Sequence, residues 1–463
     1  MTRKLVYGPT FEEMLHPERI DPNVRERALK AFQEDVLDPV NLYNITWKGP
    51  DNKVRYFVVP KALTGVEPNI ILLYGKDFPT GSHKVGATYS VAVEKQLRGE
   101  IRPGEHTLVW PSTGNYGIGG AWVGPRMGYD SLVILPEQMS AERFERIAYY
   151  GARAIATPGC ESNVKEIYDK CKELVKADPD RVRVLNQFEE MGNYRFHYYV
   201  TGNSVVEAVQ ELGRKGIGNG RTAAFVSAMG SAGTIAAGDR LKEVFYETRI
   251  VGLEPIQCPT LSYNGYGAHD IQGIGDKHVT WIHNVNNMDA MMCIDDLECK
   301  KGLQLLTDPV GLEYLAGDVG IDQEAVQTLS RIIGISGVCN ILGAIKTAKF
   351  YEFGPNDNIV TVATDAIDRY ESVMGALSEA YGAMDRVKAA CRHEAIFLSA
   401  KLDHIIEGTV ENRKRWHNLK YYTWVEQQGK TVEELNAQKS QEYWVAQRAK
   451  VAEIDAMIRA ARA

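Results

Sequence analysis

The chain has 463 residues, and 53 Lys and Arg against 60 Asp and Glu give a formal net charge of −7. Apolar residues make up 44% and charged residues 24%, which fits a globular chain and excludes a disordered or fibrous one. The mild acidity argues against nucleic-acid partners, and no apolar run approaches the roughly 20 residues that a membrane span needs. Seven scattered cysteines and the lack of a signal peptide predict reduced thiols and a cytoplasmic location.

Short apolar runs alternate with helical stretches from about residue 70 onward. Strands are expected at 69–74, 107–110, 131–135, 154–156, 183–185, 223–226, 249–253 and 358–363. Short apolar strands separated by helices are typical of parallel sheets that helices cover on both faces. The pattern therefore predicts an α/β fold.

Four parts are expected along the chain. Residues 1–69 form an N-terminal segment packed on the core, 70–205 and 206–375 form two α/β domains, and 376–463 form a helical C-terminal extension. Within the extension, the stretch 379–406 contains no strand-like run. We expect the extension to pack on its own protomer or on a dimer partner. Its removal should then reduce solubility or oligomerisation before it alters the chemistry.

A lysine follows the first strong strand. The sequence PTGSHK at 79–84 is a glycine-containing turn, and apolar residues after it fall on one face of a helix. Lys84 therefore lies near a helix N-terminus, where the positive end of the helix dipole lowers the pKa of the ammonium group. A neutral amine is what Schiff-base chemistry needs. An ordinary solvated lysine is the alternative.

Three turns of small residues each lead into a helix. They are PSTGNYG at 111–117, SAMGSAGT at 227–234 and GISG at 334–337. Backbone N–H groups in such turns can bind an anion, and plain strand-to-helix turns or a serine helix cap are the alternatives. Neither the dinucleotide-binding GxGxxG spacing nor a P-loop is present.

The order and spacing of these four features resemble the fold-type II enzymes that use pyridoxal 5′-phosphate (PLP). These are the tryptophan synthase β-like proteins, with cysteine synthase, cystathionine β-synthase, threonine synthase and serine/threonine dehydratase among them. Four more segments, NQFE at 186–189, GLEP at 252–255, IQGIG at 271–275 and TDAIDRY at 364–370, resemble stretches of cysteine synthases. The resemblance covers about residues 70–375 and implies two open parallel-sheet domains.

The resemblance implies a role for individual residues. Lys84 matches the lysine that forms the internal aldimine and serves as base for the Cα proton. Ser336 matches the neutral residue next to the pyridine nitrogen, and no metal ligands are implied. The cofactor's phosphate would be held by Gly230, Ser231, Ala232, Gly233 and Thr234. The substrate α-carboxylate would be held by Ser112, Thr113, Gly114 and Asn115, and Asn115 would also lie beside the cofactor's ring hydroxyl.

The implied reaction is β-elimination or β-replacement on a small Ser- or Cys-like amino acid through an aminoacrylate intermediate. A neutral Ser336, in place of an Asp, favours expulsion of the β-substituent, so the chain would be a PLP-dependent lyase or transferase. A serine/threonine-type dehydratase or ammonia-lyase, and a PLP subunit acting with a second protein, remain alternatives. Trp110 and Pro111 replace the glutamate of tryptophan synthase β chains, which argues against tryptophan synthesis. A homodimer or higher homo-oligomer is expected, with no nucleic-acid or membrane partner.

Overall fold

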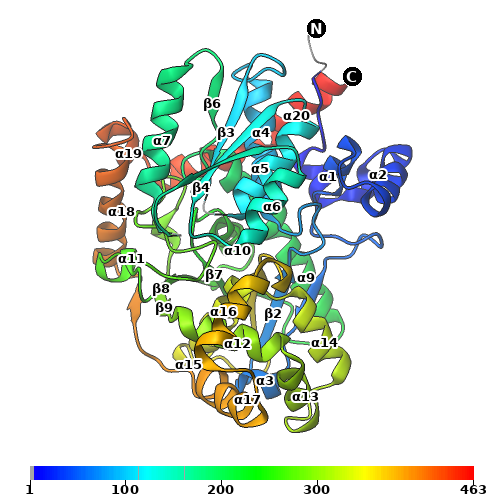
Figure 1. Ribbon diagram of the computed structural model, residues 1–463, viewed down its shortest axis with the longest axis vertical. Helices are drawn as coiled ribbons and strands as arrows, with labels where there is room; N and C mark the ends of the chain where they lie inside the picture. The colour runs from blue at the N-terminus through cyan, green and yellow to red at the C-terminus, as the bar shows by residue number, and fades with distance from the viewer. Residues whose placement is uncertain (1–4, 113, 161) are drawn as a thin grey trace.

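The computed structural model describes residues 5–112, 114–160 and 162–463, and it has two lobes, each built around a sheet (Figure 1). The smaller sheet has four parallel strands in the order β5-β4-β3-β6. Its strands are β3 (Thr107–Pro111), β4 (Asp130–Pro136), β5 (Arg153–Thr157) and β6 (Val182–Val184). The helices of this lobe are α4 (Lys84–Leu97), α5 (Asn115–Arg126), α6 (Ala141–Tyr149), α7 (Val164–Ala177) and α8 (Met191–Phe196), whereas the next helix, α9 (Gly202–Arg214), packs on the other lobe.

The larger sheet has seven strands in the order β1-β2-β10-β7-β8-β9-β11. Its five inner strands are parallel, and the edge strands β1 and β11 pair antiparallel with their neighbours. The strands are β1 (Tyr56–Val58), β2 (Asn69–Tyr74), β7 (Ala224–Ala228), β8 (Arg249–Pro255), β9 (Ala290–Ile294), β10 (Asn358–Ala363) and β11 (Ile405–Glu407). The helices that follow these strands are α10 (Ala237–Val244), α11 (Thr260–Tyr263), α12 (Asp296–Thr307), α13 (Pro309–Gly317), α14 (Gln323–Ile332) and α15 (Ile335–Phe350).

Both faces of each sheet are buried, as the continuous apolar strands predicted. In β7, Phe225 packs in the cluster that includes α9 and α10, whereas Ala224 and Val226 pack in the cluster that includes α12 and α15. In β3, Leu108 and Val109 divide in the same way between the α4–α5 side and the α7 side. This alternation confirms the α/β fold with parallel sheets covered by helices.

One strand lies in a different sheet from the one expected. The predicted unit 70–205 includes β2, but β2 pairs in parallel with β10 over six residue pairs and so belongs to the larger sheet. The apolar run 69–74 is compatible with either sheet, because its composition does not specify which strand it pairs with. The exact domain boundaries stay predictions.

The C-terminal extension is helical, as predicted, with one exception. The strand β11 overlaps the end of the stretch 379–406, which was expected to contain none, because residues 405–407 add an antiparallel edge to β9. The helices are α16 (Glu371–Tyr381), α17 (Arg386–Arg392), α18 (Val410–Trp424), α19 (Val432–Ala437) and α20 (Gln441–Arg462). The N-terminal helices are α1 (Phe11–Leu15), α2 (Pro22–Glu34) and α3 (Lys61–Thr64).

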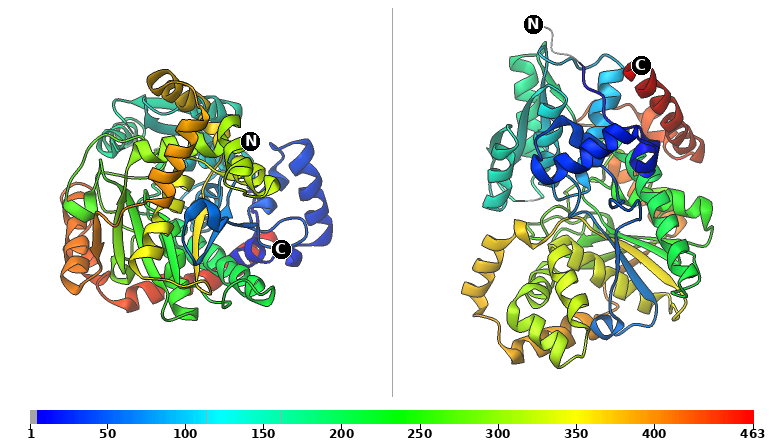
Figure 2. Two further views of the ribbon diagram at one scale, coloured as in Figure 1. Left: turned by 90° about the horizontal axis from the view of Figure 1, so that it is seen from below. Right: turned by 90° about the vertical axis from the view of Figure 1, so that its right-hand side faces the viewer.

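The extension packs on its own chain. Helix α20 lies against α4 and α8, and its C-terminal end meets the N-terminal segment (Figure 2). Asp455 of α20 accepts hydrogen bonds from the backbone N–H groups of Phe11 (2.7 Å) and Glu12 (3.0 Å). In the described part of the chain no single helix is long and apolar enough to cross a membrane. The one pair that qualifies by length and composition, α14 with α15, is bent by 120°.

Candidate active site

The predicted lysine and the predicted glycine loop lie side by side between the two lobes. Lys84 is the first residue of α4, which follows β2, and the loop 230–234 follows β7 in the same sheet. Lys84 Nζ donates a hydrogen bond to Ser231 Oγ at 3.2 Å. The structure therefore brings the proposed Schiff-base amine to the proposed phosphate loop.

The Lys84 ammonium is buried, and burial lowers its pKa to about 8, although the negative charge of Asp276 opposes this shift. The predicted lowering of this pKa is confirmed, with burial as its main cause. At pH 7 a pKa of about 8 leaves roughly a tenth of the amine neutral, far more than an exposed lysine would have. The amine is thus suited to reaction with a carbonyl group.

Three N–H donors converge on the hydroxyl oxygen of Ser231. Besides Lys84, they are Asn193 Nδ2 at 3.0 Å and the backbone N–H of Gly233 at 3.4 Å. Such a set of donors suits a phosphate oxygen. Ala232 in the same loop has a left-handed backbone with φ of +58°, a conformation that costs a side-chain-bearing residue about 1 kcal/mol.

The glycines of the loop are packed closely against neighbouring segments. An ideal Cβ on Gly230 would lie 2.9 Å from the carbonyl oxygen of Gly273, and one on Gly233 would lie 2.1 Å from Asn193 Oδ1. Neither position accepts a side chain without movement of its neighbours. Closely packed glycine backbone beside a buried amine is what binding of a phosphorylated aldehyde requires.

The turn expected to bind the substrate carboxylate is held by one of its own members. Ser112 Oγ accepts hydrogen bonds from the backbone N–H groups of Gly114 (2.9 Å) and Gly117 (2.7 Å). These two N–H groups therefore point to Ser112, and the serine shapes the turn. The guanidinium of Arg143 lies against Gly114 and leaves no room for a Cβ there. Thr113, which was also predicted to bind substrate, lies outside the described residues.

Asn115 is clamped by the segment 364–370, whose roles the sequence did not predict. Asn115 Nδ2 donates to Asp365 Oδ2 at 2.6 Å, and Asn115 Oδ1 accepts from Arg369. Tyr370 donates its hydroxyl to the same Asp365 oxygen at 2.8 Å. The amide of Asn115 is thereby fixed in orientation at the start of α5. Ser336 lies in the first turn of α15, and Asp365 Oδ1 would be only 2.2 Å from an ideal Cβ on the preceding Gly334.

Two buried histidines beside the lysine were missed as site residues. His83 Nε2 shares a hydrogen bond of 3.1 Å with Thr234 Oγ1 of the phosphate loop. The His83 ring stacks on Trp47 with centroids 5.3 Å apart and meets the edge of His197 at 5.2 Å. Burial lowers the pKa of both imidazoles well below the usual value, so both are neutral. The GSHK sequence was the signal for His83, but nothing local pointed to His197.

Comparison with known proteins decides the family. The family model described as "pyridoxal-phosphate dependent enzyme" matches residues 75–365. This chain belongs to that family. It is 30% identical over 295 residues to a probable cysteine synthase of Bacillus subtilis, covering 64% of this chain and 85% of that protein.

Two solved structures are similar to this PLP-dependent enzyme. Cysteine synthase from Entamoeba histolytica aligns with a TM-score of 0.60 at 22% identity, covering 75% of this chain and 93% of that one. O-acetylserine-dependent cystathionine β-synthase from Helicobacter pylori aligns with a TM-score of 0.57 at 25% identity, covering 69% and 94%. These structures confirm the fold, and the family match together with the relatives confirms the fold-type II assignment and the dependence on PLP.

The packing around Gly233 makes its replacement informative about the cofactor site. Gly233→Ala would drive a methyl group into Asn193 Oδ1. We expect the affinity for PLP to fall by about 5- to 150-fold, the equivalent of the 1–3 kcal/mol that overpacking costs. Fluorescence titration of the cofactor-free protein with PLP measures this. Gly317→Ala, where an added Cβ has nothing within 4 Å, is the matched control. Equal affinities in the two variants would contradict a phosphate site at this loop.

Proposed function

We propose that this enzyme eliminates or replaces the β-substituent of a small amino acid, as its likeness to cysteine synthases suggests. The observation that carries the proposal is the placement of Lys84, a buried amine with a pKa of about 8 that lies 3.2 Å from Ser231 in the phosphate loop. When bound, PLP draws electron density from the substrate's Cα. The chain's own residues position the substrate and move its protons.

Lys84 has two roles in this proposal. Its amine holds the cofactor before substrate arrives, and once released it takes the proton from Cα. Because burial keeps the pKa of Lys84 near 8, the amine can accept this proton and return it at neutral pH. The loop 230–234 would hold the phosphate throughout, so that the lysine and the reacting carbon would keep their relative positions.

The turn 112–117 and the start of α5 would orient the substrate. The carboxylate is expected beside the turn that Ser112 holds, where Arg143 adds positive charge against Gly114. The clamped amide of Asn115 would fix the plane of the cofactor ring. Ser336, buried at the start of α15, supplies no charge to stabilise a carbanion, so loss of the β-substituent is the favoured outcome.

A panel of amino acids tests the proposed function. Purified protein should be yellow, and its visible absorbance should shift with O-acetyl-L-serine, L-serine or L-cysteine. Acetate or sulfide release that depends on an added acceptor would support replacement. Pyruvate and ammonia without an acceptor would support the dehydratase alternative. A panel in which the Cα–H bond exchanges but no β-substituent leaves would contradict the proposal. A homo-oligomer and a cytoplasmic location stay predictions.

A further inference from the structure

A buried aspartate follows the IQGIG segment and faces the phosphate loop. Gly273 and Gly275 have φ of +100° and +80°, which side-chain-bearing residues rarely adopt, so these glycines determine the path of the segment. An ideal Cβ on Gly273 would lie 4.0 Å from Asn115 Nδ2, and one on Gly230 would lie 3.4 Å from Asp276 Oδ2. The segment therefore passes Asn115 and brings the Asp276 carboxyl group to the phosphate loop.

Hydrogen bonds hold the backbone around Asp276 in place, whereas its carboxyl group has no hydrogen-bond partner among the described residues. Thr260 Oγ1 donates to the Asp276 carbonyl oxygen at 3.0 Å, and the Gly275 N–H donates to the carbonyl oxygen of Met229 at 2.8 Å. Both carboxyl oxygens of Asp276 are buried and have no hydrogen-bond partner among the described residues. An unpartnered buried carboxyl group is unfavourable for folding, so it calls for an explanation in function.

A second buried carboxyl group, that of Glu254, lines the same small cavity as Asp276 and differs from it in having hydrogen-bond partners. Glu254 at the end of β8 accepts hydrogen bonds from the backbone N–H groups of Leu261 (3.0 Å) and Ser262 (2.7 Å). Glu254 thus holds α11 in place, which is a structural task. Asp276 has no such task for its side chain, and its oxygens remain available to a molecule in the site.

The charge balance around Asp276 keeps its proton mobile. Burial raises its pKa to about 7, and the positive charge of Lys84 opposes that shift. Burial also lowers the pKa of His278 and of His283 to about 3, so both imidazoles are neutral near pH 7. The titratable groups that face it are Lys84, Tyr168, Glu254, Cys258, His278 and His283.

We propose that Asp276 is a second proton carrier of this site, which takes the proton of a neutral acceptor as that acceptor bonds to the substrate's β-carbon. The inference rests on the proposed function and adds the acceptor's chemical class, a protic nucleophile such as a thiol, alcohol or water. The acceptor's proton moves to an Asp276 oxygen while its electron pair forms the bond to Cβ. The electron pair of the substrate's Cα=Cβ bond moves to Cα, which takes a proton from the Lys84 ammonium.

Two residues therefore transfer the two protons. Lys84 donates a proton to Cα, and Asp276 accepts the proton of the group that bonds to Cβ. An acceptor that arrives already as an anion needs no such base, and neither does a leaving group such as acetate that departs as an anion. These two exceptions separate a proton-transfer role from a structural one.

Asp276→Asn, which keeps the shape and removes the proton carrier, tests the proposal. In a single turnover with O-acetyl-L-serine and no acceptor, we expect the variant to release acetate at the wild-type rate. Reaction with neutral 2-mercaptoethanol should slow by about 10²- to 10⁴-fold, the usual loss of a general base. With the anionic thiol thionitrobenzoate, the loss should be much smaller. In the wild type the 2-mercaptoethanol step should show an inflection near pH 7, where Asp276 loses its proton. In the variant this inflection should vanish, and the rate should follow only the ionisation of the thiol itself to the thiolate.

A measurement without bound cofactor checks the same group. The infrared spectrum of the cofactor-free wild type should contain a protonated carboxyl band that titrates near pH 7, and Asp276→Asn should lack it. Glu254→Gln, which alters the structural carboxyl group of the same cavity, should keep both this band and the pH dependence of the 2-mercaptoethanol step.

Three results would overturn the assignment. One is an Asp276→Asn variant that loses acetate release as strongly as the acceptor step, because this would mark a structural role. The second is a variant with an unchanged pH profile for 2-mercaptoethanol. The third is a wild type that releases no β-substituent from any amino acid, in which case the proposed function fails and this inference fails with it. Only in the first two does the proposed function survive.

Discussion

Replacing Lys84 by alanine should abolish turnover while leaving the fold intact. The variant loses both the amine that would hold the cofactor and the base for the Cα proton, so we expect turnover to fall at least about 10³-fold. The fold should survive because the lost ammonium is buried at an energetic cost that depresses its pKa, and because, among the described residues, its side chain donates a hydrogen bond only to Ser231. Near-UV circular dichroism tests whether the fold is intact, and an assay with O-acetyl-L-serine measures the loss of turnover.

Lys84→Arg is the matched control, because it keeps the positive charge but offers no amine for a Schiff base. It should be as inactive as the alanine variant. Borohydride reduction of the wild type followed by peptide mapping should find the pyridoxyl group on Lys84. A label on any other lysine, or an active Lys84→Arg enzyme, would refute this role for the residue.

Deleting residues 408–463, which removes α18, α19 and α20, should prevent stable folding and not merely reduce solubility. The side chains of Trp416, Trp424 and Trp444 are fully buried. Loss of a buried tryptophan side chain costs about 3–5 kcal/mol. Three such losses match the whole stability of a typical domain, about 5–15 kcal/mol. Urea unfolding followed by tryptophan fluorescence and circular dichroism tests this.

The extension is also fastened to segments that border the candidate site. Trp416 Nε1 donates to the carbonyl oxygen of Leu261 at 3.0 Å, and Trp424 Nε1 donates to that of Val279 at 2.8 Å. The buried Lys420 ammonium donates to the carbonyl oxygens of Trp281 (3.1 Å) and His283 (2.7 Å). Helix α18 therefore holds the segment that runs on from Asp276, and a truncated chain should lose PLP binding too.

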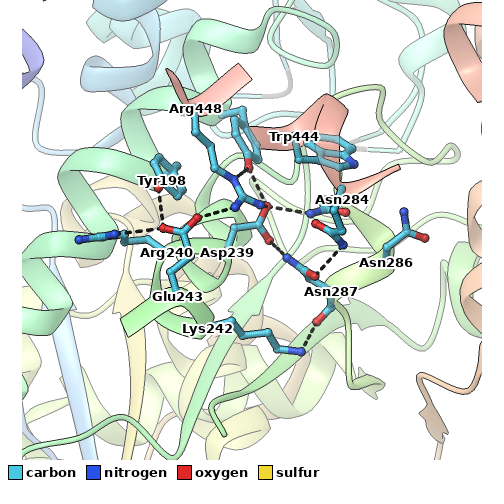
Figure 3. A network of polar contacts seen from close by, with 12 residues as sticks. Tyr198, Asp239, Arg240, Lys242, Glu243, Asn284, Asn286, Asn287, Trp444 and Arg448 are labelled. Atoms are coloured by element: carbon cyan, nitrogen blue, oxygen red, sulfur yellow. Dashed lines mark hydrogen bonds and ion pairs between the residues drawn. The ribbon is translucent and has the colours of Figure 1, made fainter. Parts of the chain in front are cut away.

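Helix α20 makes the corresponding attachment to the helix behind the phosphate loop. Arg448 reaches Asp239 and Glu243 of α10, and Asp239 also accepts hydrogen bonds from Asn284 and Asn287 (Figure 3). Arg448 Nη2 lies 3.1 Å from Asp239 Oδ2. Since α10 follows the loop 230–234 directly, the extension supports the cofactor site from this side as well.

Single substitutions on α18 measure how much individual side chains of the extension contribute to the free energy of unfolding. Trp424→Ala should lower the free energy of unfolding by about 3–5 kcal/mol. Tyr422→Ala, two residues away on a side chain that is 64% exposed, should change it by less than about 0.5 kcal/mol. A truncated protein that folds and binds PLP as tightly as the full chain would show that the extension is dispensable for this site.

Much of this enzyme is determined by local sequence. Runs such as 69–74 and 358–363 predict strands because their apolar composition suits a sheet buried on both faces. Lys84 and the loop 230–234 are recognisable because a turn that binds a cofactor must use particular residues at particular spacings. The order of these features along the chain identified the family.

Tertiary structure decided what depends on residues far apart in the chain. Asn115 and Asp365 are 250 residues apart and share a hydrogen bond of 2.6 Å, which no local pattern encodes. The pairing of β2 with β10 placed it in the larger sheet, and the packing of α18 made the extension part of the fold. Burial raised the pKa of Asp276 to about 7, although the positive charge of Lys84 opposes this shift. Solvent exclusion and partner charges set such a pKa, and both arise only when distant segments come together.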